Sequence, residues 1–506
     1  MNTKSLKFAM GLLTSTFGIS QAQNQAPNLI YVFPDQFRKS AMSFWDLPEY
    51  KGAVNTKADP VSTPNINKFA SESLVFTSAV SNLPVCSPHR ASLLTGLYPS
   101  QSGVPLNCIS TRPFNTLPQS VVTFSDVLAS NNYDMAYFGK WHLDFPTPND
   151  PERPGNYVDE RRPAWDAYTP PQKRHGFATW YSYGTFDEHK NPHYWDSEGK
   201  KHSPGEYSPK HEADKVIEYL KSRKDPGKPF AVFVSMNPPH SPYNSLNDCM
   251  EQDYNIYRDK PVSKLLLRDN ADTTMKKSKS VRYYFANVTG VDREFGRILQ
   301  ALKELGVDKN TIVVFSSDHG ETMCSHGTDD PKNQIYDEAF QVPMLIRWPG
   351  KIEHRTDDLL IGSPDIMPTL LSMMGLRKDI PKSVQGSDYS SIILDRNSTA
   401  KRPQSAIYFY NQDGEKSSDG LVQSYFPARR GIRTHQYTLE LTINTKNELV
   451  NTKFFDNNRD PYQLVNLPVK RENPVIQNLL KEMSLWLRQS NDPWYKQKIL
   501  SDWISY

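Results

Sequence analysis

The sequence predicts an α/β protein. Its large domain has a mostly parallel central sheet flanked by helices, and a smaller C-terminal α+β domain with an antiparallel sheet follows. Short continuous apolar runs rich in β-forming residues, typical of strands buried on both faces, alternate with helical patterns. Most of these runs end in polar residues, as strands do where an open α/β sheet binds a ligand. After about Gly375 the pattern breaks up, and the later strands are short and of the antiparallel type.

Length and charge narrow the function. At 506 residues with 37% hydrophobic content, the chain can bury a large core. The formal net charge is +3 and no long basic run occurs, so nucleic acid is not an expected partner. The 9 Trp, 26 Tyr and 23 Phe are enough to build the core and to leave some rings for stacking on sugars.

The first residues have the three parts of a secretory signal peptide. Lys4 and Lys7 precede an apolar stretch at 8–19, and small residues up to Ala22 provide the cleavage site. No other segment reaches the about 18 apolar residues that a membrane anchor needs. We therefore expect an exported protein without a membrane anchor, in the periplasm or secreted. The expected domains are 1–22 (signal peptide), 23–375 and 376–506.

The first buried strand, expected at 27–33, runs into Asp35 and Gln36. At the carboxyl end of a parallel strand these residues are placed to bind a ligand, although Asp35 alone would cap a helix equally well. A helix expected from residue 63 and a strand at 74–76 then lead to the stretch 84–96.

The stretch 84–96 combines a helix start with residues suited to hold an anion. Pro88 follows Cys86 where a proline fixes φ, and Arg90 precedes a small and apolar run. The N-terminus of a helix offers free N–H groups and a positive dipole end, so Cys86 and Arg90 would lie at an anion site. A lone cysteine in this position would more often be a buried structural residue.

Two further strand exits carry titratable groups. The strand at 133–138 leads to Lys140 and His142, which lie two steps apart and can face the same way. The strand at 229–236 leads into a proline-rich turn that presents His240 at its tip. The region between them reads as a long ordered insertion. Its candidates for lining a substrate pocket, each of which could equally be a packing residue, are Tyr181, His189, His193 and Trp195.

The last buried strand of this series, at 311–317, follows a long amphipathic helix and ends in Asp318 and His319, with Lys332 shortly after. If the strands are parallel, the polar groups at their ends converge at one edge of one sheet.

The converging acids predict a metal site. Asp35, Gln36 and Asp318 supply oxygen ligands, which suit a hard cation such as calcium, and magnesium or manganese would also fit. Two strand-end acids beside an anion site need a cation between them.

The C-terminal strands are expected at 406–410, 431–433 and 437–442, with a closing amphipathic helix at 475–487. The candidates for sugar contacts from this domain, each of which could be an ordinary surface charge, are Arg429, Arg430 and His435.

Together these motifs resemble the type I sulfatases. Cys86, Pro88 and Arg90, followed by Thr95-Gly96, match every fixed position of that family's signature. The later blocks of the family resemble Gly139-Lys140-Trp141-His142, Pro239-His240-Ser241-Pro242 and Asp318-His319-Gly320-Glu321. The resemblance covers nearly the whole chain after residue 22. It implies an alkaline-phosphatase-like fold in which 23–375 is the catalytic domain.

The resemblance also implies a cofactor made from the chain itself. In this family the cysteine matched by Cys86 is oxidised to formylglycine, here by a maturase before export. The implied calcium ligands are Asp35, Gln36, residue 86, Asp318 and His319. His319 stands where the family often has asparagine, so the identity of the metal stays open. With Cys86 modified, Cys108, Cys249 and Cys324 remain and at most one disulfide can form.

The implied mechanism starts from the hydrated aldehyde, a geminal diol. One hydroxyl, held by Arg90, attacks sulfur while Lys140 and Lys332 neutralise the sulfate oxygens. His240 protonates the departing sugar oxygen, and His142 then removes the proton of the second hydroxyl so that sulfate leaves.

The substrate expected from the resemblance to exported bacterial carbohydrate sulfatases is a sulfated host glycan, either mucin or glycosaminoglycan. We expect exo action, with a lean towards 6-O-sulfated N-acetylglucosamine. The alternatives are 4-O- or 6-O-sulfated galactose or N-acetylgalactosamine, and aryl sulfates. A phosphatase of the same superfamily is disfavoured by Cys86 in an intact signature, and an inactive glycan-binding relative by the presence of every catalytic position.

Overall fold

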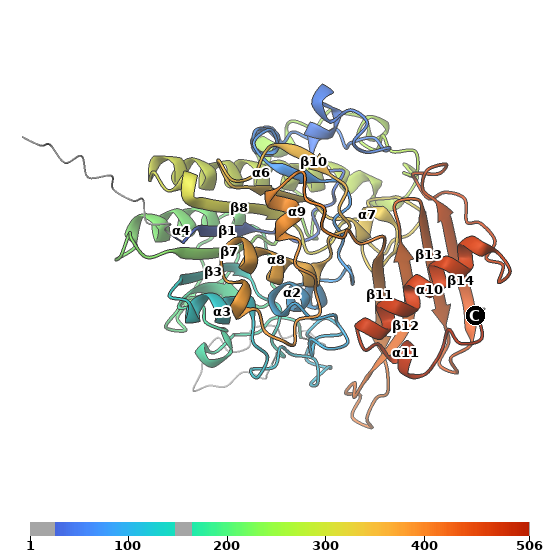
Figure 1. Ribbon diagram of the computed structural model, residues 1–506. Coiled ribbons are helices and arrows are strands. Elements are labelled where there is room, and N and C mark those ends of the chain that lie inside the picture. The colour runs from blue at the N-terminus through green and yellow to red at the C-terminus, as the bar shows by residue number, and fades with distance from the viewer. Residues whose placement is uncertain (1–25, 147–163, 505–506) are drawn as a thin grey trace, which may run out of the picture.

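The computed structural model describes residues 26–146 and 164–504, so the expected signal peptide lies outside the described residues. In the described part of the chain, the large lobe is built on a ten-stranded sheet in the order β10-β2-β9-β8-β1-β7-β3-β4-β5-β6 (Figure 1). Its strands are β1 (Asn28–Val32), β2 (Leu74–Phe76), β3 (Asp134–Lys140), β4 (Thr179–Tyr183), β5 (Tyr194–Trp195), β6 (Lys201–His202), β7 (Phe230–Ser235), β8 (Thr311–Ser316), β9 (Met344–Arg347) and β10 (Arg355–Asp357).

The middle of this sheet is parallel. Strands β8, β1, β7, β3 and β4 are consecutive parallel neighbours. By contrast, β9 runs antiparallel to β8 and β2, and β5 runs antiparallel to β4. The residues that follow β1, β3, β7 and β8 therefore emerge at the same edge of the sheet. The predicted mostly parallel α/β architecture is confirmed.

Helices cover both faces of the sheet (Figure 1). Successive strand residues point to opposite faces, so Val32 and Phe315 pack with one layer of helices and Tyr31 and Val314 with the other. Burial on both faces explains why these strands read as continuous apolar runs. The first layer contains α1 (Pro64–Ala70), α4 (Ser208–Ser222) and α6 (Val281–Glu304), and the second contains α2 (Cys86–Thr95), α3 (Phe124–Ser130), α8 (Ile366–Met373) and α9 (Ser390–Leu394). Two short helices are α5 (Glu251–Tyr254) and α7 (Asp337–Phe340).

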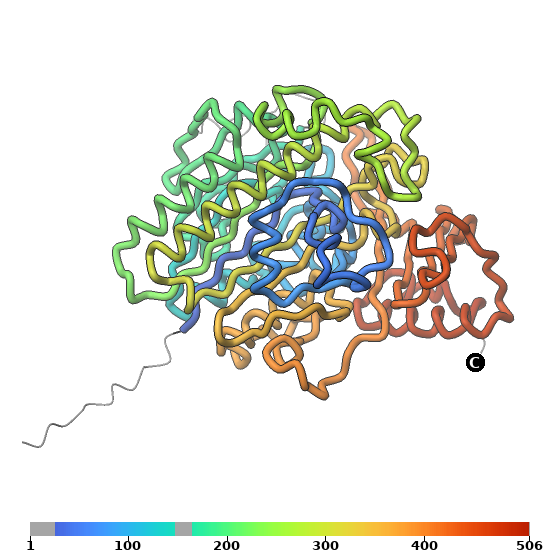
Figure 2. Tube along the Cα trace, turned by 90° about the horizontal axis from the view of Figure 1, so that it is seen from above, coloured from blue at the N-terminus to red at the C-terminus, as the bar shows by residue number. Residues whose placement is uncertain are grey.

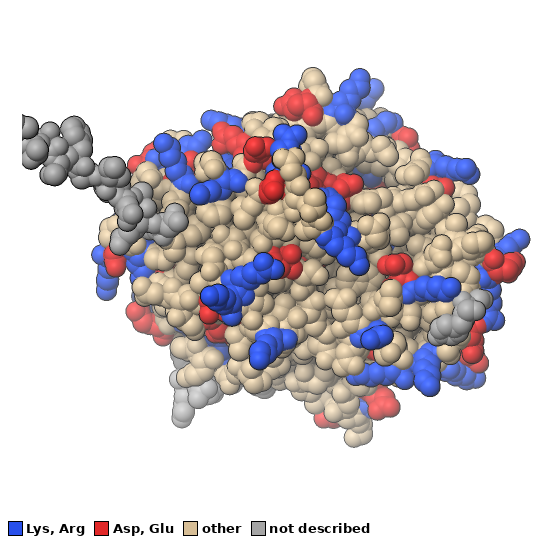
Figure 3. Space-filling model, viewed as in Figure 1, with Lys and Arg blue, Asp and Glu red and all other residues tan. Residues whose placement is uncertain are grey.

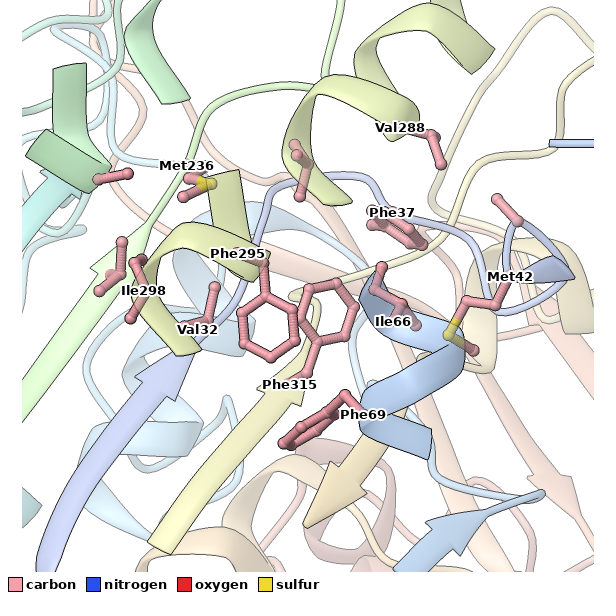
Figure 4. Packing of buried hydrophobic residues seen from close by; sticks show 14 of the residues in the cluster. Val32, Phe37, Met42, Ile66, Phe69, Met236, Val288, Phe295, Ile298 and Phe315 are labelled. Atoms are coloured by element: carbon pink, nitrogen blue, oxygen red, sulfur yellow. The ribbon is translucent and has the colours of Figure 1, made fainter. Parts of the chain in front are cut away.

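Aromatic packing fixes α6 and α1 over β8 (Figure 4). The ring of Phe295 on α6 lies 4.9 Å from that of Phe315 on β8, and 5.1 Å, edge-on, from that of Phe69 on α1. Each such pair contributes about 0.5–1.5 kcal/mol beyond the burial of its area. The carboxyl end of β8 is thereby held in place.

The C-terminal residues form a second lobe beside the large one (Figure 2). Its sheet is antiparallel throughout, in the order β11-β12-β13-β14, as predicted for this part of the chain. Apolar residues of this lobe, such as Ile407 and Leu480, share a cluster with Leu83 and Val85, which directly precede α2. The second lobe therefore supports the segment that contains Cys86. Its elements are β11 (Ala406–Asp413), β12 (Tyr425–Arg433), β13 (Tyr437–Ile443), β14 (Leu449–Asp456), α10 (Pro474–Gln489) and α11 (Pro493–Lys496).

Some elements were not anticipated. The insertion contributes β4, β5 and β6, which extend the central sheet, and β14 completes the second sheet. The expected domain boundary at 375–376 precedes α9, whose Ile392 and Ile393 pack in the large lobe. The second sheet itself begins at Ala406.

The surface carries both signs of charge. Figure 3 shows basic and acidic side chains interspersed over one face, in keeping with the net charge of +3. Among residues 26–146 and 164–504, none of the helices has the length and apolar character needed to span a bilayer.

Candidate active site

The predicted site residues converge at the carboxyl ends of β1, β3, β7 and β8. Arg90 lies at the centre of the cluster. Its Nη2 donates to Asp35 Oδ2 at 3.0 Å and to Asp318 Oδ2 at 2.9 Å, and its Nη1 donates to the Lys140 carbonyl oxygen at 2.8 Å and to Ser235 Oγ at 2.6 Å. One buried guanidinium thus joins the ends of four strands, and its planar fork suits this role better than an ammonium group would.

Cys86 occupies the first position of α2 and is buried. The Asn107 side chain accepts a hydrogen bond from the backbone N–H of Ser87 at 3.0 Å, which satisfies one of the free donors at the helix start. Lys332 Nζ lies 3.2 Å from Cys86 Sγ. Burial alone would raise the pKa of the Cys86 thiol, but Lys140, Lys332 and His319 lower it well below its usual value.

The other three cysteines differ sharply from Cys86. All four are free and buried, but burial raises the pKa of Cys108 and Cys249 to about 12 and that of Cys324 to about 11. Of the four, only Cys86 lies in a positive field. This environment marks residue 86 as the reactive position.

Lys140 reaches the same cluster because a glycine precedes it. Gly139 has φ +92°, and a Cβ there would lie 2.1 Å from the Ser235 carbonyl oxygen, so any side chain would force β3 and β7 apart. The Lys140 ammonium then lies 2.8 Å from Asp35 Oδ2 and donates to Asn237 Oδ1 at 3.3 Å.

The residues at this edge fit a divalent cation. Ligand atoms of Asp35, Cys86, Asp318 and His319 all lie within 4.8 Å of one another. The Nδ1–H of His319 donates to the Gly320 carbonyl oxygen at 2.9 Å, which leaves the Nε2 lone pair for a metal. Buried Oε1 of Gln36 has no hydrogen-bond partner among the described residues, as expected of a ligand atom whose cation supplies the missing contact.

Glu321 sets the orientation of the Gln36 amide. Its Oε2 accepts from Gln36 Nε2 and, at 2.9 Å, from the Tyr243 hydroxyl, while its Oε1 accepts from the Met323 N–H at 2.9 Å. A carboxylate only accepts, so it fixes Nε2 towards itself and Oε1 away from itself. The sequence motif contained Glu321, but no role was predicted for it.

We expect Glu321→Gln to raise the Kd for calcium by about 10- to 100-fold, because an amide at this position could also donate and let Gln36 turn over. Calorimetric titration of metal-depleted protein with calcium measures this directly. Lys277→Met is the matched control, since Lys277 Nζ lies 3.6 Å from Glu321 Oε1 and the change leaves the bond to Gln36 in place. Because Lys277→Met removes a positive charge, it should leave calcium affinity unchanged or raise it slightly. Unchanged affinity in Glu321→Gln, or an equal loss in Lys277→Met, would contradict the orienting role of Glu321.

His142 is prepared to act as a base. Its Nε2–H donates to the Cys108 carbonyl oxygen at 3.1 Å, since a carbonyl can only accept, so the lone pair lies on Nδ1. This Nδ1 is buried and has no hydrogen-bond partner among the described residues. Burial, the largest effect, lowers the pKa of His142, with Lys140 and Arg90 adding to it. The ring is therefore neutral at neutral pH.

His240 has the opposite environment. Its Nδ1–H donates to the Ser241 carbonyl oxygen at 2.7 Å, and Asp187 Oδ1 lies 3.4 Å from the same nitrogen. Lys332 Nζ lies 3.1 Å from Nε2. Burial and two lysines oppose the charged ring, but Asp35 and Asp187 outweigh them and raise the pKa of His240 to about 9. One histidine is thus suited to accept a proton and the other to donate one.

These groups surround a cavity of about 340 Å³, large enough for a sugar sulfate. The six residues predicted to be catalytic are all in the cluster, and all but Arg90, which lies beneath it, line the cavity. The lining residues that sequence reasoning missed are Asn107, Trp165, Thr185, Asp187 and Ser241.

Most of the predicted substrate contacts lie elsewhere. Tyr181, His193 and Trp195 are buried, and their rings pack with those of neighbouring residues. His189 is also buried and donates to the Asp248 carbonyl oxygen. None of these four lines the cavity, and we no longer propose them as substrate contacts.

The three candidates for sugar contacts in the second lobe, Arg429, Arg430 and His435, lie in different environments. Arg430 is buried and forms a bidentate pair with Asp492, a structural role. His435 lines a different, polar pocket and lies 3.7 Å from Asp358. Arg429 alone points towards the site, with Nη1 3.5 Å from the carbonyl oxygen of Asn333, the neighbour of Lys332.

Comparison with known proteins covers both lobes. The family model described as Sulfatase matches residues 27–376, and one described as N-sulphoglucosamine sulphohydrolase, C-terminal, matches residues 325–490. A Bacteroides thetaiotaomicron protein named endo-4-O-sulfatase is 58% identical over 488 residues, which cover 96% of each chain. A Formosa agariphila protein named ulvan-active sulfatase is 33% identical over 91% of this chain and 80% of its own. A structure solved in work on the metabolism of multiple glycosaminoglycans by B. thetaiotaomicron has a TM-score of 0.93 and 58% identity, covering 95% of this chain and 100% of the other.

Proposed function

Because the chain belongs to the sulfatase family, we propose that it removes 4-O-sulfate groups from internal sugars of a glycosaminoglycan, with Cys86 acting as formylglycine. It is a sulfuric ester hydrolase with sulfated glycans as its substrate class. The observation that carries the finer proposal is the 58% identity, over 96% of both chains, to the relative named endo-4-O-sulfatase.

One expectation from the sequence is wrong. The lean towards exo action on 6-O-sulfated N-acetylglucosamine is overturned by that relative, whose name specifies endo action and the 4-O position. The motifs that suggested a sulfatase carry the residues expected around the sulfate, and no motif was identified among the residues expected to contact the rest of the sugar. The pattern of motifs could not separate these substrates.

The reaction begins with the diol formed when water adds to the aldehyde of residue 86. One hydroxyl attacks sulfur and its proton passes to the carboxylate of Asp318, within 4.8 Å of position 86. Lys140 and Lys332 neutralise the sulfate oxygens. As the bond between sulfur and the sugar oxygen breaks, His240 donates the Nε2 proton to that oxygen.

The second step releases sulfate. His142 Nδ1 takes the proton of the remaining hydroxyl, the bond between carbon and the sulfate oxygen breaks, and the aldehyde forms again. Sulfur is attacked only once. That is the advantage of a diol over a serine or cysteine nucleophile, whose ester would need water to attack sulfur a second time.

We propose calcium as the metal, because oxygen donors outnumber the single imidazole in the site. Asp35, Gln36, Asp318, His319 and residue 86 would hold it. When bound, the cation would lower the charge on the sulfate oxygens and favour ionisation of the attacking hydroxyl.

We also propose that the chain is exported, to the periplasm or beyond, and that a formylglycine-generating maturase acts before export. The amino-terminal pattern at 1–22 supports this proposal, together with the bacterial glycan sulfatases that the chain matches. Edman sequencing of protein collected from the periplasm would identify the cleavage site.

The function is tested with a long glycosaminoglycan that bears 4-O-sulfate on its hexosamine, with its 6-O-sulfated isomer as the control. With residue 86 converted, as mass spectrometry verifies, we expect most of the sulfate to be released from the intact 4-O-sulfated polymer. Little should be released from the isomer. Release of only about one sulfate per chain, rising after the polymer is cut by a lyase, would contradict endo action. Preference for the isomer would contradict the 4-O assignment.

A further inference from the structure

A second cavity of about 340 Å³ opens beside the active cavity. The two share Asn107, Trp165 and Lys332 in their linings, so they are direct neighbours on either side of these side chains. The far side of the second cavity is the end of β11, at residues 410–413, in the C-terminal lobe. Each cavity is of a size for one sugar ring. A chain whose sulfated sugar occupies the first would place a neighbouring sugar in the second.

The second cavity carries positive charge. Arg112 lines it and is half-buried. Its Nε donates to Asp413 Oδ1 at 2.7 Å and its Nη1 to the Asn107 carbonyl oxygen at 3.0 Å. The Nη2 of Arg112 makes no hydrogen bond to any described residue. Asp413 is the only acid among the described lining residues, and it is already paired with Arg112.

A second guanidinium, that of Arg429, packs behind the lining residues of the second cavity. Arg429 lies opposite Tyr410 in the register of β11 and β12, and its guanidinium carbon is 4.2 Å from the centre of the Tyr410 ring. Tyr410 and Asn333, to whose carbonyl oxygen Arg429 points, both line the second cavity. Lys332 lines both cavities. The cationic side chains in or next to the second cavity, Arg112, Arg429 and Lys332, therefore outnumber its single acid, Asp413, among the described residues.

We propose that the second cavity is a subsite for a carboxylate-bearing sugar next to the sulfated one, and that Arg112 binds the carboxylate. The inference rests on the proposed function and extends it to the neighbouring sugar. A half-buried guanidinium with a remaining N–H edge binds a carboxylate more strongly than exposed lysines do. The apolar floor, formed by Leu83, Val85 and Leu106, suits the C–H face of a sugar ring.

The subsite also gives the second lobe a role in binding the substrate. Residues 410–413 close the cavity from that lobe, while Leu83 and Val85 join the same lobe's apolar cluster. The packing that holds the start of α2 therefore also aligns the two cavities. An enzyme that cuts sulfate from internal sugars needs such room for the rest of the chain.

The test combines the removal of the Arg112 charge from the protein with the removal of the carboxylate charge from the substrate. The substrates are a 4-O-sulfated tetrasaccharide with intact hexuronate carboxylates and the same tetrasaccharide with its carboxylates reduced to alcohols. Fully converted wild type, Arg112→Met and Arg112→Lys are compared by kcat/KM for sulfate release. Lys416→Met is the matched control: it removes a cation 4.0 Å from Asp413 that does not line the cavity.

We expect wild type to prefer the intact substrate by on the order of tenfold, as for a charge-assisted hydrogen bond. Arg112→Met should lose most of that preference, Arg112→Lys should keep part of it, and Lys416→Met should keep it all. Equal loss on both substrates in Arg112→Met would show that Arg112 only holds the Asn107 loop, and would overturn the subsite. If wild type hydrolysed the intact and the reduced substrate equally well, this result alone would overturn the subsite. No release from either substrate would overturn the proposed function and the subsite together.

Discussion

Replacing Cys86 by alanine is expected to lower kcat for sulfate release at least about a thousandfold, as removal of a catalytic nucleophile does in other enzymes. Alanine cannot be oxidised to an aldehyde, so no diol can form at the start of α2. The positive field of Lys140 and Lys332 would still bind sulfate, so affinity for sulfated product should change much less than kcat. Initial rates measure the loss of kcat, and calorimetric titration of each protein with free sulfate measures the affinity separately.

Cys249→Ala is the matched control for this change. Cys249 is a buried thiol whose pKa is raised to about 12, and it lies outside the active cavity. We expect it to retain activity. In wild-type preparations, activity should scale with the fraction of residue 86 converted to formylglycine, measured by mass spectrometry. Full activity in a preparation without any conversion would contradict formylglycine as the nucleophile.

The half of the site at the strand ends could be predicted because a parallel sheet imposes its own geometry. Four apolar runs each ended in an ionisable residue, and the carboxyl ends of parallel strands meet at one edge. Asp35, His142, His240 and Asp318 were predicted in this way to converge, while their roles came from the resemblance to the sulfatases, and the structure brings them together. The stretch that contains Cys86 could be placed with them because a helix start beside an arginine attracts an anion.

The loop half of the site could not be predicted. Asp187, Thr185 and Trp165 come from an insertion without periodic pattern, and they meet His240 only through the tertiary fold. The aromatic residues chosen from that insertion pack inside it instead. Tyr181 and Trp195 lie on β4 and β5, which extend the sheet, and a ring that packs has the same apolar faces as a ring that stacks on sugar.

Register decides between the two adjacent arginines of β12. Neighbouring residues of a strand point to opposite faces, so Arg429 packs against Tyr410, which lines the second cavity, while Arg430 faces Asp492 inside the lobe. A shift of one residue in the pairing would exchange their roles. The sequence contains both arginines but not the register, so it gave both the same candidate role.

His240→Asn is expected to lower kcat/KM on a glycan sulfate by about 100- to 10,000-fold, the usual contribution of a general acid. An alkoxide leaves poorly without a proton, whereas an aromatic phenolate leaves well. The loss should therefore be much smaller on an aryl sulfate with a good leaving group. Parallel assays of the two substrates measure the difference. An equal loss on both would assign His240 to binding and contradict its role as the acid.

The pH profile tests the same assignment independently. The pKa of His240 is raised to about 9 from its ordinary 6.5, so the proton it donates is present below that pH and is lost as the pH rises through it. Wild-type kcat/KM on the glycan should therefore fall above about pH 9. Asp187→Asn keeps the ring but removes a carboxylate that raises its pKa, so this fall should move to lower pH. A fall at an unchanged pH in Asp187→Asn would mean that another group limits the alkaline side. A shifted fall, together with the leaving-group difference, would identify the imidazolium as the donor.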